Sequence, residues 1–314
     1  MNNTRQILMP ALCAMTSLGI ASARVEAAEF ATNGFAQPPG VDILDKAASP
    51  PPGVYGTVGI NYSDRKATGP GTPAGGEPVT SFGASPAINW VTPWTVLGAQ
   101  YSVVFVQPVN YAYIGGPINV QRQGMHSTYV APLNLSWALG DTGLFFKAFV
   151  STYVPDGHIT GPAGTGSIGA NWWTFQPGTV LTYRNEGWEF TLKDALEINS
   201  KNRDTDYKSG DVLHLSFLAT KTIGNWTVGP VVTYIGQVSN DSSSAYYHGA
   251  VAANRYNDLA LGGLVGYNFG PATANFWFTN DDHVTASGGH AGPSDPATFT
   301  KGVNLYMALS FRIK

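Results

Sequence analysis

The stretch Val303-Asn304-Leu305-Tyr306-Met307-Ala308-Leu309-Ser310-Phe311-Arg312 alternates between two kinds of side chain along its whole length. The odd-numbered positions carry large apolar groups, and the even-numbered positions carry small or polar ones. Successive side chains of a β-strand point to opposite faces, so the pattern predicts a strand that presents one face to an apolar environment.

The same alternation recurs from Val54 onward in stretches of about ten residues, separated by breaks rich in Gly, Pro, Asn and Asp. The breaks alternate in length. Short ones fall near residues 92–93, 140–143, 185–187, 224–225 and 270–271, and long ones near 64–80, 108–123, 154–169, 200–210, 239–256 and 281–300. This order predicts twelve strands joined by five short turns and six long loops.

The composition agrees with a membrane barrel. Asp, Glu, Lys and Arg make up 12% of the chain, about half the share usual in soluble domains. A barrel with lipid outside and water inside accounts for so little charge. We therefore predict an all-β fold, a monomeric transmembrane antiparallel up-and-down β-barrel over residues 53–314, with short periplasmic turns and long extracellular loops.

Aromatic residues near the predicted strand ends favour a membrane barrel over a soluble β-sandwich, because such girdles mark the two bilayer interfaces. They are Tyr62, Trp90, Trp94, Trp137, Tyr183, Trp188 and Trp226. One residue conflicts with the pattern. Asp194 lies in phase with the apolar set of its strand, which indicates a bulge, a shifted register or a charge near lipid.

Residues 1–28 are interpreted as a secretory signal peptide with cleavage between Ala23 and Ala28, and they contain the single cysteine, Cys13. The mature chain would then form no disulfide and no thiolate metal site. Residues 29–52 are proline-rich and are interpreted as a periplasmic lead-in, which is either a disordered linker or a plug that folds into the lumen.

Titratable residues gather on the predicted lumen faces: Lys147, Arg184, Glu189, Lys193, Glu197 and His214. We expect the side chains of Glu189, Lys193, Glu197 and His214 to converge in the interior. They would form a charged constriction or ligand site, or else a salt-bridge network that stiffens the lumen. Trp172 or Leu218 could supply an apolar wall beside them.

Enzymatic function finds little support. Ser209, His214 and Ser216 lie close in sequence, but there is no Gly-x-Ser-x-Gly elbow, so a membrane-embedded lipid hydrolase is the least favoured alternative. We expect no catalytic residues, no metal site and no cofactor, and the net charge of −3 gives no reason to expect nucleic acid.

Residues 197–214 contain a motif that resembles a known family. It consists of an Asn-rich stretch, then Thr-Asp-Tyr-x-Ser-Gly-Asp, then a histidine on the next strand. Its matching residues are Asn199, Asn202, Asp204, Thr205, Asp206, Tyr207, Ser209, Gly210, Asp211 and His214. The stretches 51–55, 94–98 and 225–229 support the match. The family is that of outer-membrane proteins of the MetA pathway of phenol degradation, or SphA-like transporters.

The resemblance implies a bacterial outer-membrane channel for small hydrophobic or aromatic compounds. Its expected partners are such a ligand, outer-membrane lipids and lipopolysaccharide, and the barrel-assembly machinery. Judged from its residue types alone, the motif forms a turn-rich extracellular loop. Its residues either stabilise this loop or gate the passage of the substrate. A structural or adhesive surface barrel without transport remains the alternative function.

Overall fold

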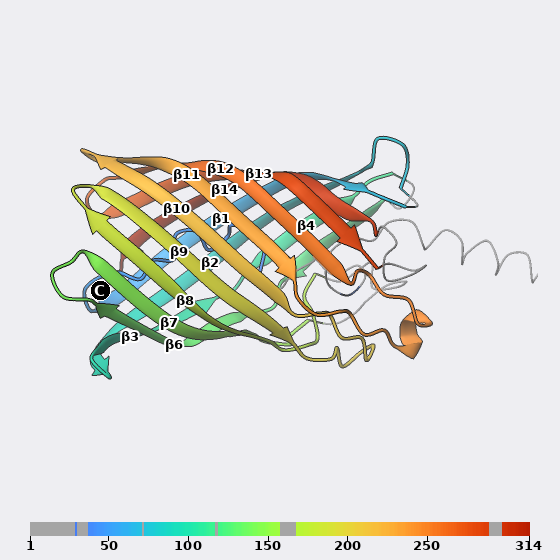
Figure 1. The fold of residues 1–314 in the computed structure, drawn as a ribbon, viewed down its shortest axis with the longest axis horizontal. Coiled ribbons are helices and arrows are strands. Elements are labelled where there is room, and N and C mark those ends of the chain that lie inside the picture. The colour runs from blue at the N-terminus through green and yellow to red at the C-terminus, as the bar shows by residue number, and fades with distance from the viewer. Residues whose placement is uncertain (1–28, 30–36, 71, 117–118, 158–167, 289–296) are drawn as a thin grey trace, which may run out of the picture.

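The computed structural model describes residues 29, 37–70, 72–116, 119–157, 168–288 and 297–314. These residues form one closed antiparallel sheet with tilted strands (Figure 1). The described part of the chain contains no helix that is long and apolar enough to span a bilayer. A short 3₁₀ turn, η2 (Ala245–Tyr247), lies in the loop before β12. The predicted signal peptide falls outside the described residues.

The sheet is built from fourteen strand segments. They are β1 (Gly53–Thr68), β2 (Glu77–Val96), β3 (Ala99–Val106), β4 (Val109–Ile114), β5 (Val120–Met125), β6 (Tyr129–Ala138), β7 (Leu144–Tyr153), β8 (Thr174–Asn185), β9 (Trp188–Asn199), β10 (Val212–Ile223), β11 (Trp226–Gln237), β12 (Arg255–Asn268), β13 (Ala272–Ser287) and β14 (Phe299–Arg312).

Two barrel strands are each divided into two segments. β3 and β4 follow each other end to end along β2, with which both pair. In the same way β6 pairs with β3 and β5 pairs with β4, so β5 and β6 follow each other along the next barrel strand. The fourteen segments therefore make twelve barrel strands, and β1 closes the barrel by pairing with both β2 and β14. The predicted fold class and strand number are confirmed.

The predicted strand faces are confirmed as well. Along β9, Thr191, Lys193 and Glu197 are buried toward the interior, whereas Phe190 and Leu192 are exposed on the outside. Asp194 pairs with Thr179 and Leu215 without a shift of register. It therefore faces outward, and the Thr179 hydroxyl donates a hydrogen bond to its carboxylate.

Two predicted connections were wrong. Residues 92–93 lie inside β2 at a register shift between Val91 and Thr95, and the turn falls at residues 97–98. Pro93 has no amide hydrogen to give to a ladder, which makes a bulge a natural place for it. The long loop expected near 108–123 is largely the β4–β5 hairpin, in which β4 keeps the apolar alternation at Val109 and Tyr111 and β5 has none.

The short turns and the C-terminus lie at one end of the barrel, at the left of Figure 1, and the longer loops lie at the other. Aromatic residues mark the short-turn end. Of the predicted girdle, Trp94, Tyr183, Trp188 and Trp226 are exposed there, within three residues of a turn. Large exposed apolar side chains fill the outer face between the ends, as lipid contact requires.

Residues 37–52 enter the lumen instead of joining the sheet. Successive turns coil residues 38–45 through backbone bonds from Val41, Ile43 and Asp45. Ile43 and Ala47 are fully buried among inward-facing barrel residues, and the Ala47 amide donates to the Thr182 hydroxyl at 3.0 Å. We call residues 37–52 the lumen segment.

Candidate functional site

The centre of the lumen holds two buried lysines from different strands, Lys147 on β7 and Lys193 on β9, each opposite Val180 of β8. Two aspartates of the lumen segment meet them. Lys193 Nζ lies 2.7 Å from Asp42 and 3.0 Å from Asp45, and Lys147 contacts Asp45. Because buried charges are costly unless paired, these contacts fix the lumen segment against the wall.

An aromatic ring lies beside both lysines. The Phe149 ring centroid is 4.8 Å from Lys193 Nζ and 5.9 Å from Lys147 Nζ. Ammonium groups this close to a ring face are attracted by its quadrupole. The site therefore combines two cations with an aromatic surface, and the lumen segment covers it.

Two further polar clusters hold the lumen segment, one on each side of the centre. Toward the short turns, Glu189 pairs with Lys46 of the lumen segment and with Arg184. Toward the long loops, Glu197 accepts the Gln37 amide at 2.8 Å and lies 3.0 Å from Nε2 of His214. The lumen segment thus meets charged wall groups along its length.

An apolar cluster lies on the wall opposite the two lysines. Ile43 packs into a buried cluster of Leu218, Val231, Leu264, Trp277, Tyr306 and Ala308. The rings of Trp277 and Tyr306 are stacked with their centroids 5.1 Å apart. Both also bind the backbone of the lumen segment, because the Trp277 indole donates to Gly40 O at 2.9 Å and the Tyr306 hydroxyl donates to Pro39 O.

The predicted lumen residues all lie on inner faces, yet they do not converge into one cluster. Glu197 and His214 meet each other, whereas Lys193 and Glu189 bind separate parts of the lumen segment. The reason is spacing. Residues four apart in a strand lie about 13 Å apart along it, so Glu189, Lys193 and Glu197 share a face without touching.

Sequence reasoning missed Asp42, Asp45 and Lys46. No strand or helix period marks the proline-rich stretch that contains them. Charge complementarity could have found them, because the lumen faces carry lysines and glutamates that need opposite charges and this short stretch supplies both signs.

The residues of the family motif connect two loops at the long-loop end of the barrel, the β9–β10 loop and the β11–β12 loop. The Tyr207 hydroxyl donates to Asp241 and accepts the Ala252 amide at 2.9 Å. Asp241 also accepts the Gly210 amide at 2.7 Å, and Asp206 takes a left-handed conformation, φ 57°. Within the β9–β10 loop the Asn199 amide donates to Asp211, and Asn171, which precedes β8, donates to Asp204. Asn202, Thr205 and Ser209 contact Glu29.

Burial raises the pKa of Asp241 to about 6, although hydrogen bonds from Tyr207, Gly210 and Gln237 partly offset the loss of solvent. Protonation of Asp241 is therefore more favourable in the folded loops than in the unfolded chain. Its contribution to stability is fully present below the unfolded pKa, near 4, and is lost as pH rises through about 6.

We expect the two loops to open more readily at pH 7 than at pH 4.5. Hydrogen exchange of the Gly210 amide, corrected for the intrinsic pH dependence of exchange, measures this opening. Asp241→Asn is nearly isosteric and does not titrate, so it should reduce the pH dependence to the part that comes from Glu29, whose pKa is also raised by burial. An unchanged profile in that variant would show that another group titrates.

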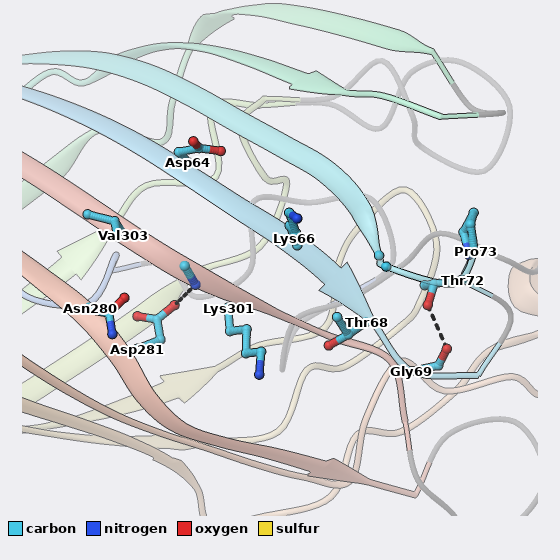
Figure 2. Close-up of a pocket in the computed structure, with 13 residues that line it drawn as sticks. Asp64, Lys66, Thr68, Gly69, Thr72, Pro73, Asn280, Asp281, Lys301 and Val303 are labelled. Carbon is cyan, nitrogen blue, oxygen red and sulfur yellow. Dashed lines mark hydrogen bonds between the residues drawn. The ribbon is translucent and has the colours of Figure 1, made fainter.

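The outer surface near the long loops carries a recess of about 760 Å³ between the β1–β2 loop and strands β13 and β14 (Figure 2). Lys66 and Lys301 are direct cross-strand partners there, and both are exposed. Like charges directly opposite each other are destabilising, so an anion at this position would stabilise the strand pair.

The closed sheet, its apolar outer face and its polar lumen define a transmembrane β-barrel of the outer-membrane type. The chain matches the family model described as "Putative MetA-pathway of phenol degradation" over residues 63–308, and it belongs to that family. A search of curated proteins gives no match.

Among solved structures, the COG4313 outer membrane channel from Pseudomonas putida F1 is 14% identical, with a TM-score of 0.69 over 86% of this chain and 100% of its own. That likeness shows a shared fold. The toluene transporter TbuX of Ralstonia pickettii is 12% identical, with a TM-score of 0.42 over 87% of this chain and 93% of its own. It is too distant to carry an argument.

Proposed function

We propose that the protein is a bacterial outer-membrane channel for small hydrophobic or aromatic molecules, and that the lumen segment closes it at rest. The observation that carries this proposal is the chemistry of the lumen wall. Stacked Trp277 and Tyr306 face one side of a segment that is not part of the sheet, and Lys147, Lys193 and Phe149 line another. Membership of a phenol-degradation family supports an aromatic cargo.

A phenol suits this wall in two ways. Its ring matches the apolar cluster around Leu218 and Trp277. Its hydroxyl can form hydrogen bonds with Glu197 or His214, which lie on the inner faces of adjacent strands. Both surfaces become available when residues 37–47 leave the lumen.

Planar-bilayer recordings test the channel directly. The purified protein should show rare, brief openings, and a variant lacking residues 37–47 should conduct steadily. Phenol should reduce the current of the deletion variant, and Glu197→Ala or His214→Ala should weaken that block while the barrel stays heat-modifiable. A deletion variant that folds yet conducts nothing would refute the channel.

A surface role without transport is the second candidate, because the lumen is filled and the loops that carry Tyr207 and Asp241 are joined by hydrogen bonds. A folded deletion variant that does not conduct would favour this role. The hydrolase alternative gains no support: His214 faces Glu197, the Ser216 hydroxyl faces Asp42, and Ser209 accepts the Glu29 amide.

We further propose that the protein is a monomer placed in the outer membrane by the barrel-assembly machinery after its signal peptide is removed. Lipopolysaccharide phosphate is the anion we assign to Lys66 and Lys301. Both lysines lie on the outer face beside the longer loops, where the outer leaflet would present phosphate groups.

The orientation gives a direct prediction. Epitope tags inserted near residues 205 and 245 should be labelled on intact cells, because these loops lie at the end of the barrel that would face outward. Tags at residues 140–143 or 186–187 should be labelled only after the outer membrane is permeabilised. The reverse result would invert the proposed topology.

A further inference from the structure

The carboxylate of Glu29 lies in a pocket between the two joined loops, and the residue is only 2% exposed. Three side chains donate to this carboxylate: the Thr205 hydroxyl, the side-chain amide of Asn202 and the Tyr247 hydroxyl, the last at 2.7 Å. The Glu29 amide donates to Ser209 Oγ at 2.8 Å. We call Asn202, Thr205, Ser209 and Tyr247 the carboxylate pocket.

The pocket donors are also held by contacts that do not involve Glu29. The backbone amide of Asn202 donates to the Tyr207 carbonyl oxygen at 2.8 Å. The side-chain oxygen of Asn202 accepts the backbone amide of Asp204 at 2.9 Å. Tyr247 packs edge-on against the Tyr207 ring, with the centroids 5.4 Å apart. A pocket held in this way keeps its shape when its occupant leaves, which is the condition for binding a second ligand.

An exposed aromatic surface next to the pocket favours a ligand that carries a ring. Beside the pocket, Tyr246 is 46% exposed, and its ring centroid lies 4.8 Å from that of Tyr247. A ligand ring could pack on this tyrosine surface while its acid group takes the place of Glu29.

We propose that the carboxylate pocket is a receptor for aromatic carboxylates arriving from outside the cell, and that Glu29 is its built-in competitor. Binding displaces Glu29, which precedes the lumen segment in the sequence, and loosens the contacts of the segment's first residue, Gln37, with the wall. This site goes beyond the proposed channel, because a ligand can bind at the outer mouth whether or not it crosses the membrane.

Tethering makes Glu29 a strong competitor. A group on a short linker acts at an effective concentration in the millimolar range, so an external carboxylate binds weakly until Glu29 is removed. The affinity of the Glu29→Ala variant for benzoate should therefore exceed that of the unaltered protein at least tenfold.

Isothermal titration of the detergent-purified mature protein with benzoate tests this, with benzamide as the uncharged analogue. Glu29→Ala and Glu29→Gln should bind benzoate tightly and benzamide weakly. Adding Thr205→Val, which removes one pocket hydroxyl with little change in volume, should reverse the gain. Asp141→Ala, in an exposed turn at the other end, removes a carboxylate without touching the pocket and should behave like the unaltered protein.

A separate experiment measures whether residue 37, at the start of the lumen segment, becomes accessible when the ligand binds. Gln37→Cys would be the only cysteine of the mature chain, and it is buried in the structure. Benzoate should increase its labelling by a maleimide. Equal affinities with and without Glu29 would overturn the proposal, as would equal binding of benzamide, provided that heat-modified mobility shows the variants are folded. Failure of the channel in bilayers would leave these results unaffected.

Discussion

Lys193→Met is expected to lower the free energy of unfolding by about 3 kcal/mol, because breaking a buried ion pair leaves its partner uncompensated. Asp42 and Lys193 are the most enclosed ion pair between the lumen segment and the wall, with side chains 12% and 6% exposed. Methionine keeps most of the side-chain volume but not the charge. Urea unfolding in lipid vesicles measures the loss, and bilayer recordings should show more frequent openings.

Asp42→Asn supplies the matched control. The double variant Lys193→Met/Asp42→Asn leaves no unpaired charge at this pair, and Asp45 keeps Lys147 as its partner. It should therefore be more stable than Lys193→Met alone. If the two losses simply add, the two residues do not interact, and the lumen segment is held by its apolar contacts.

Phe217→Arg is expected to cost about 2–4 kcal/mol, the range for a cation placed on the lipid face near the bilayer midplane. Phe217 lies in the middle of β10 and points outward, with 38% of its surface exposed. The measurement is the midpoint of reversible unfolding in vesicles of defined thickness, compared with Phe217→Leu.

Ile223→Arg provides a test of depth on the same face. Ile223 ends β10 and is 65% exposed beside a short turn. There an arginine can reach the headgroups, so the expected cost falls to about 0–1 kcal/mol. Equal losses at both positions would show that the bilayer is not centred on the middle of β10.

The strand faces could be predicted from the sequence because lipid imposes a simple rule. Leu305, Met307 and Leu309 must be apolar, and no such demand acts on Asn304 or Ser310. The rule weakens where strands extend beyond the bilayer. β5 follows no apolar alternation, and the sequence around it therefore predicts a loop.

Only the wall residues of the lumen contacts could be predicted from the sequence. Lys193 and Glu197 were identified because they occupy regular positions on a strand. Their partners Asp42 and Gln37 lie more than 140 residues away in a stretch without a period. Local patterns carry no information on such long-range pairs, so which groups meet could only come from the three-dimensional structure.

The path of the lumen segment has a consequence for assembly. Glu29 lies among the loops at one end, and β1 begins at Gly53 at the other. Residues 37–49 run through the interior between these two ends, and β1 is also one of the two strands that close the barrel. Pairing of β1 with β14 therefore also holds the end of the lumen segment at the rim of the barrel, so closure of the seam sets the point from which the segment enters and leaves the interior.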